Sequence, residues 1–192
     1  MQANHVVKRK ITTYDIVITA LFAAICYVAT NFRIDIPTPL GKTMIHCGNV
    51  FCLLSAMLMG GLRGGIADAT GLTLFDLTGG WATSAPSTFV MRFVMGLVCG
   101  SISTAGRKKE KRTLWMIISA VTGMATYVVL YLSYSFLKGI VLGNAVGTVL
   151  VDVASKAATS VPAGCVSVVV AVVLYPFFYK ALTAAGYYQK RA

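Results

Sequence analysis

The chain has 192 residues, of which 57% are hydrophobic and only 12% are charged. A soluble domain carries roughly 25% charged residues, so this chain has too few polar side chains to cover a surface that faces water. Its 17 lysines and arginines outnumber its 6 aspartates and glutamates, but basic residues in a membrane protein act first as topology signals. The composition therefore predicts one integral membrane domain over residues 1–192, and it does not require nucleic acid as a partner.

Apolar stretches of nearly membrane-spanning length follow one another along the chain. A helix needs about 20 mostly apolar residues to cross the hydrocarbon core. We predict an all-α bundle of six membrane-spanning helices over residues 14–32, 45–59, 64–77, 86–104, 113–137 and 155–180. Pro37 and Pro39 resist helix continuation and predict a loop over residues 33–44. Residues 138–155 are glycine-rich and are predicted to be irregular and only partly helical, and the sixth helix to bend near Pro162.

The basic residues are distributed unequally between the two sides of this bundle. The side of the termini carries Lys8, Arg9, Lys10, Arg63, Arg107, Lys108, Lys109, Lys111, Arg112, Lys180, Lys190 and Arg191, and the other side only Arg33, Lys42, Lys138 and Lys156. Positive residues stay on the cytoplasmic side of a membrane. Both termini are therefore predicted to be cytoplasmic.

Two ionisable residues, Asp76 and Arg92, come at similar depth in the outer half of neighbouring predicted helices. Charges within spans are costly and usually face a partner or a polar pocket. The two side chains either form a buried ion pair that holds the helices together, or Arg92 contacts a ligand directly. Asp68 is predicted nearer the cytoplasmic end, as a helix-end or partner contact.

Tyr127, Tyr131 and Tyr134 share one face of the fifth predicted helix because they are spaced i, i+4 and i+7. The stripe is either part of an aromatic belt at the membrane interface or a stacking wall for a flat ring. Polar residues at outer helix ends would complete such a pocket, namely Trp81, Ser87, Thr88, Thr159 and Ser160.

The first predicted helix carries small residues at Ala20, Ala23 and Ala24. Small residues on one helix face allow another helix to approach closely in lipid. This face serves either internal packing or the docking of another membrane protein.

Two other kinds of site are poorly supported. The stretch "PLGKT" ends like a nucleotide-binding loop, but Ile36 stands where the motif needs glycine. His46, Cys47 and Cys52 lack a fourth metal ligand, and adjacent residues point apart on a helix, so we predict no metal. The five cysteines are interpreted as small hydrophobic residues, and no motif indicates an enzyme.

The whole pattern resembles the S components of energy-coupling factor (ECF) transporters, which import vitamins into bacteria and archaea. The resemblance rests on Ala20-x-x-x-Ala24, on "IHCGNVFCLLSAMLMGGLRGGIADATGLTLFDL", on "APSTFVMRFVMGLVCG" and on the six predicted spans. It covers nearly the whole chain and is closest to the riboflavin, pyridoxine and hydroxymethylpyrimidine branch.

The resemblance implies a multi-pass protein of a prokaryotic cell membrane, embedded in lipid, that has no ATPase site or cofactor of its own. A separate transmembrane coupling subunit and two cytosolic ATPase subunits, which use the ATP, would be its partners. Ala20, Ala23 and Ala24 would dock on the coupling subunit, and residues 33–44 would act as a gate. The ligand would contact Arg92, Tyr127, Tyr131, Tyr134, Lys156, Thr159, Ser160 and Trp81, while His46 and Asn49 would anchor the gate and serve as secondary ligand contacts.

The expected substrate is a small, flat, polar ring. Vitamin B6 or hydroxymethylpyrimidine is the first choice and riboflavin the next. The alternatives are a self-sufficient carrier or channel, and a membrane-assembly subunit without a ligand.

Overall fold

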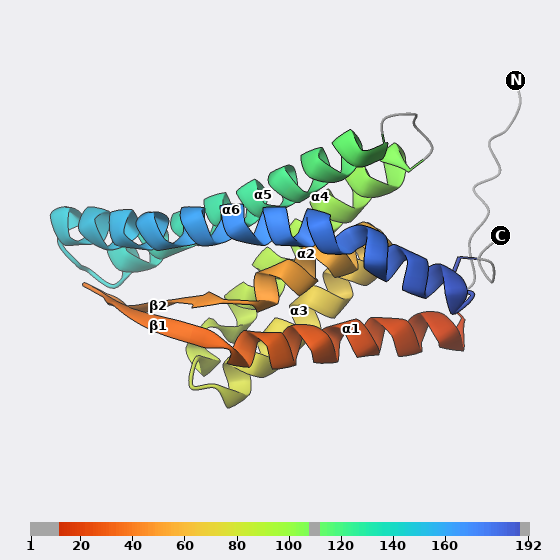
Figure 1. Ribbon diagram of the computed structural model, residues 1–192. Coiled ribbons are helices and arrows are strands. Elements are labelled where there is room, and N and C mark those ends of the chain that lie inside the picture. Colours follow the sequence, from red (N-terminus) through yellow and green to blue (C-terminus); the bar gives the residue numbers. More distant parts are fainter. Residues whose placement is uncertain (1–11, 108–111, 189–192) are drawn as a thin grey trace, which may run out of the picture.

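The computed structural model describes residues 12–107 and 112–188, which form a helical bundle with one β-hairpin (Figure 1). The elements in chain order are α1 (Thr13–Asn31), β1 (Arg33–Thr38), β2 (Gly41–His46), α2 (Gly48–Met59), α3 (Gly61–Thr78), the short 3-10 helix η1 (Ala82–Ser84), α4 (Ala85–Gly106), α5 (Arg112–Val141) and α6 (Val146–Ala184). The predicted helical bundle is therefore confirmed.

Within the described residues, four helical segments are long and apolar enough to cross a membrane: α1, η1 with α4, α5 and α6. The central helix α2 is apolar but shorter, so the number of six spans stays a prediction. The start of α1 and the end of α6 lie at one end of the bundle, where the Tyr14 hydroxyl donates to the Ala185 carbonyl over 2.8 Å. Several of the basic residues behind the predicted orientation, at 8–10, 108–109, 111 and 190–191, lie outside the described residues, so the cytoplasmic location of the termini also stays a prediction.

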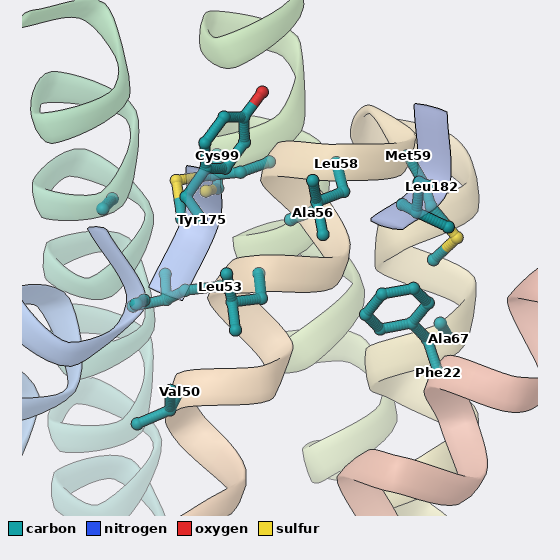
Figure 2. Close-up of a cluster of buried hydrophobic side chains, with 14 of the residues drawn as sticks. Phe22, Val50, Leu53, Ala56, Leu58, Met59, Ala67, Cys99, Tyr175 and Leu182 are labelled. Carbon is teal, nitrogen blue, oxygen red and sulfur yellow. The ribbon is translucent and has the colours of Figure 1, made fainter. Parts of the chain in front are cut away.

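Helix α2 lies in the centre of the bundle, and every one of its residues except Phe51 is buried. Figure 2 shows its side chains Val50, Leu53 and Leu58 in one buried cluster with Phe22 of α1 and Tyr175 of α6. Its short, mostly apolar sequence fits this position, because a helix with apolar residues on all its faces is stable where neighbours cover it on every side. The surrounding helices hold α2 in place.

Helices α3 and α4 pack through glycines on both sides of their contact. A Cβ atom on Gly96 would overlap the backbone of Gly65, and one on Gly100 would overlap Gly61. The spacing on each helix is i, i+4, which places the two glycines on one face. Without a side chain between them, the two backbones approach closely, which is a major source of helix association in lipid.

Asp68 does not lie at a helix end, so that prediction is wrong. Its side chain is fully buried in the middle of α3, where the carboxylate accepts a hydrogen bond from the Ser55 hydroxyl of α2. The difference arises because α3 begins at Gly61 rather than at residue 64, directly after the single break at Gly60. Asp68 is thereby two turns into the helix.

The segment predicted as a loop at 33–44 is a β-hairpin, in which β1 and β2 pair antiparallel from Arg33 opposite His46 to Thr38 opposite Gly41. Pro37 is tolerated because both strands are edge strands, so its missing donor can face away from the partner strand. Strand β2 occupies residues predicted to open the second helix, and α2 begins at Gly48 instead of residue 45.

The sixth helix begins at Val146, not at residue 155, and α5 continues to Val141. The irregular segment is therefore limited to residues 142–145, much shorter than predicted. A single glycine makes the turn: Gly143 has φ of +76°, and Asn144 N–H donates to the Gly139 carbonyl over 3.3 Å. This is the hydrogen-bonding pattern of a left-handed C-cap, and it reverses the chain within a few residues.

Candidate functional site

A polar cavity of about 280 Å³ lies at the hairpin end of the bundle, between β2, η1 and helices α4, α5 and α6. It is lined by most of the residues that the sequence predicted for a ligand: His46, Asn49, Trp81, Tyr127, Tyr131, Tyr134, Lys156 and Ser160. Ser87 and Thr88 line it as well. Thr159 does not; its hydroxyl donates to the backbone carbonyls of Ser155 and Lys156, at 3.3 and 2.9 Å.

Arg92 lies directly behind the cavity, with 1% of its surface exposed. Its Nη1 donates to Asn49 Oδ1 over 2.8 Å, and its guanidinium carbon lies 3.7 Å from the centroid of the Tyr127 ring. A guanidinium that stacks on an aromatic face gains a cation–π interaction that is stronger when the pair is desolvated. Arg92 therefore fixes the positions of two residues that line the cavity.

Arg92 does not pair with Asp76: the ion pairs within residues 12–107 and 112–188 do not include one between them. Asp76 instead lines the cavity, and its carboxylate has Thr88 as a side-chain hydrogen-bond partner. Of the two interpretations of these residues, the ion pair is contradicted, and a ligand role for Arg92 stays a prediction.

His46 is the third contact of the Arg92 guanidinium, whose Nη2 lies 3.5 Å from His46 Nε2. Since arginine can only donate, Nε2 accepts and the ring proton is assigned to Nδ1. Burial, reinforced by the charges of Arg92 and Arg33, lowers the pKa of His46 to about 3. The imidazole at the base of the hairpin is therefore neutral at physiological pH.

Two tyrosines form an aromatic wall on α5. The rings of Tyr127 and Tyr131 are stacked, with centroids 5.9 Å apart and planes at 13°. The Tyr131 hydroxyl is 3.1 Å from the Thr43 hydroxyl of β2, so the wall also contacts the hairpin. Tyr134 lines the same cavity. The stripe thus faces the interior of the protein rather than forming an aromatic belt.

Asp152 and Ser135 were missed by the sequence reasoning. The Lys156 ammonium contacts Asp152 Oδ2 at 2.8 Å and donates to Ser135 Oγ over 2.7 Å, while the Leu40 N–H at the hairpin tip donates to Asp152 Oδ1 over 3.1 Å. Asp152 therefore connects the hairpin to α6. Its i, i+4 spacing from Lys156 was a helical signal, but it fell in the segment predicted to be irregular.

A second, largely apolar cavity of about 760 Å³ opens between α1 and α3 at the other end of the bundle. Ala20 and Ala23 line it, together with Ile16, Thr19 and Ile66. Ala20 and Ala24 are exposed, whereas Ala23 is buried and its carbonyl packs closely against Gly71 of α3. The alanine face therefore divides: Ala23 serves internal packing, and Ala20 and Ala24 are free of the bundle.

Comparison with known proteins identifies a matching family and a relative. The family model "ECF-type riboflavin transporter, S component" matches residues 10–184. An uncharacterised protein of Pyrococcus woesei is 25% identical over 136 residues, which cover 63% of this chain and 91% of the relative. No solved structure matches the chain.

The family match spans every described helix and the whole of both cavities. Given this family and the four long apolar helices in the described part of the chain, the protein is a multi-pass protein of a prokaryotic cell membrane. It belongs to the family of S components of ECF-type riboflavin transporters.

Proposed function

We propose that the cavity at the hairpin end binds riboflavin and that the chain delivers it to a coupling subunit for import. The observation that carries this proposal is the stacked pair Tyr127–Tyr131, which is backed by the Arg92 guanidinium on the Tyr127 ring. Such a rigid aromatic wall suits a flat conjugated ring, because aromatic faces prefer offset stacking.

Polar groups around this wall match the edges of such a ring. Asn49, Ser160 and Thr88 bring amide and hydroxyl groups to the cavity, and Lys42 and Lys138 bring ammonium groups. Ring carbonyls and hydroxyl substituents accept hydrogen bonds from donors of this kind. A few placed polar groups in an otherwise aromatic pocket fix the orientation of a ligand.

The shape of the site favours riboflavin over smaller rings. A further cavity of about 310 Å³ adjoins the first and shares Leu40, Ser135, Lys138 and Lys156 with it. Riboflavin has a ring system and a polyhydroxyl chain, and the adjoining cavity gives that chain a polar place. The name of the matched family points the same way.

Vitamin B6 or hydroxymethylpyrimidine is the second candidate. The main cavity of about 280 Å³ is at the small end for ligand pockets, which typically enclose about 300–1,000 Å³. A single small ring would fill it without using the adjoining cavity.

S components of ECF transporters work with a transmembrane coupling subunit and ATPases. In our proposal the α1–α3 cavity, with Ala20 at its wall, receives a helix of the coupling subunit, and two cytosolic ATPase subunits use the ATP. A groove lined by small residues lets a partner helix approach closely in lipid. The chain itself needs no cofactor in this scheme.

The proposal is tested by titrating the purified chain into riboflavin and following the flavin fluorescence, with thermal-shift measurements for pyridoxine and hydroxymethylpyrimidine. Stacking on the tyrosines should quench the flavin. Tyr127→Leu should weaken binding, and Tyr27→Leu, on α1 outside the cavity, is the matched control. If none of these vitamins binds or stabilises the protein, the proposal is wrong; if only pyridoxine or hydroxymethylpyrimidine does, the second candidate replaces riboflavin.

The alternative of a self-sufficient carrier is tested in proteoliposomes. We expect the chain alone to bind substrate but not to move it down a gradient. Uptake by the chain in the absence of any coupling subunit would contradict the proposed division of labour.

A further inference from the structure

A cluster of two thiols and one carboxylate lies buried where α1, α2 and α3 meet. Cys26, Cys52 and Asp68 each have 0% of their surface exposed. The Cys52 and Cys26 sulfurs are 3.7 Å apart, and the Cys26 sulfur is 4.0 Å from Asp68 Oδ1. One ligand atom from each residue lies within 4.8 Å of the others. The cluster is separate from all three cavities, because none of their linings includes Cys26, Cys52 or Asp68.

Packing alone does not account for the carboxylate in this cluster. Asp68 Oδ1 accepts a hydrogen bond from Ser55, but Oδ2 is buried without a hydrogen-bond partner. No ion pair among the described residues involves Asp68. A buried carboxylate inside a membrane protein is expensive and normally has a cation or a functional role.

The separation of the sulfurs fits a tetrahedral metal. Two thiolates that are each about 2.3 Å from a tetrahedral Zn²⁺ lie about 3.8 Å apart, close to the 3.7 Å observed. A carboxylate oxygen is the third ligand type that Zn²⁺ accepts. Met95, whose buried side chain packs in the same cluster, brings a thioether as a further soft group. Soft sulfur ligands select thiophilic ions over Mg²⁺ or Ca²⁺.

The charges of the cluster also suit a divalent ion. The Arg92 guanidinium interacts electrostatically with Cys26, Cys52 and Asp68. When a divalent ion binds, each thiol forms one metal–sulfur bond and releases one proton to water. The two positive charges of the ion replace those of the two released protons, so the net charge of the thiol pair does not change.

We propose that Cys26, Cys52 and Asp68 form a binding site for a thiophilic divalent cation of the Zn²⁺ class. The ion joins three helices at one point and is structural, because no cavity brings substrate to it. The Ser55 hydroxyl orients the carboxylate, as hydrogen bonds to metal-binding carboxylates commonly do. The proposal departs from the sequence-based prediction of no metal, which considered Cys52 only with His46 and Cys47, and it does not depend on the transported substrate.

Co²⁺ is the probe for this site, because thiolate ligation gives a charge-transfer band and a tetrahedral site gives intense visible bands. The full-length protein is purified in detergent with a phosphine reductant, and the two exposed cysteines are removed by Cys47→Ser and Cys165→Ser. We expect one Co²⁺ per chain with both spectral features, displaced by Zn²⁺. Cys26→Ser and Cys52→Ser should abolish the charge-transfer band, and Asp68→Asn should weaken binding at least about tenfold.

Cys99→Ala is the matched control, since Cys99 is also buried but lies outside the cluster. It should keep the cobalt spectrum. Absence of the bands in the parent protein, or their persistence in Cys26→Ser, would overturn the proposal.

A second measurement uses the protein with its cluster residues unchanged, so its result does not depend on whether a cluster variant folds. Binding of Co²⁺ to the parent protein should release protons in weakly buffered solution, and the apparent affinity should rise with pH. Binding without proton release would show that the thiols are not ligands and would equally overturn the proposal.

Discussion

Arg92 organises the wall of the outer cavity without being exposed in it. We expect Arg92→Lys to weaken riboflavin binding by about tenfold to a hundredfold, because lysine keeps the charge but loses the planar group that stacks on Tyr127 and bonds Asn49. Fluorescence titration of the purified variant measures the loss.

Arg33→Lys is the control for this substitution. Arg33 also stacks on an aromatic ring, with its guanidinium carbon 4.7 Å from the Phe75 centroid, but it does not line the cavity. The Arg33→Lys variant should bind riboflavin with the same affinity as the parent protein. An equal loss in both variants would mean that Arg92 acts through general stability rather than through the cavity.

His46 makes the stability of the fold depend on pH. Its pKa is about 3 in the folded chain and about 6.5 in an unfolded one. As pH falls, the unfolded state therefore binds a proton at His46 before the folded state does. His46 does not lower the free energy of unfolding above about pH 6.5, and it lowers it progressively between about pH 6.5 and 3. At pH 5 this amounts to about 2 kcal/mol.

Thermal unfolding of the detergent-solubilised protein at pH 7.5 and pH 5 measures this effect. Carboxylates titrate over part of the same range, so the informative quantity is the difference between the parent and His46→Gln. The variant should lose less stability on acidification than the parent. The same loss in both proteins would refute the assignment to His46.

At the scale of elements, the glycine contact between α3 and α4 determines how closely these helices approach. Gly96→Ala should lower the free energy of unfolding by about 1–3 kcal/mol, because the new methyl group would overlap the backbone at Gly65. Gly147→Ala is the control: it lies in α6 with nothing near its added Cβ, so it should be neutral or slightly stabilising. Melting temperatures that fall equally in both variants would contradict the close contact.

The elements that the sequence predicted well are those whose own pattern determines them. Helix α1 was expected over 14–32 and spans Thr13–Asn31, since its apolar run ends at a proline-containing segment and its start carries a capping box of Thr12 and Asp15. Periodicity likewise predicted one shared helix face for Tyr127 and Tyr131, and both side chains line the outer cavity.

The elements that were missed depend on partners distant in the chain or on one backbone angle. Residues 33–46 form a hairpin whose tip is bound by Asp152 of α6. No local sequence pattern predicts this contact, because the hairpin tip and Asp152 are far apart in the chain. Among the glycines of 138–155, only Gly143 has a positive φ, and composition alone could not distinguish it from Gly139 within α5. The cluster of Cys26, Cys52 and Asp68 needs three helices to meet, so sequence spacing could not reveal it.

The whole molecule has its two cavities at opposite ends, and this separation makes binding and transport independently testable. Ala20→Phe with Ala24→Phe should abolish vitamin uptake in cells that contain the coupling subunit and ATPases, because the bulky rings would keep a partner helix from the exposed face of α1. Riboflavin binding by the purified variant should stay within about twofold of the parent, as neither alanine lines the outer cavity. Ala125→Phe, at an exposed alanine on α5, is the matched control and should transport normally. Loss of binding together with uptake would show that the substitutions act on the fold, whereas uptake that survives them would place the docking surface on another face of the bundle.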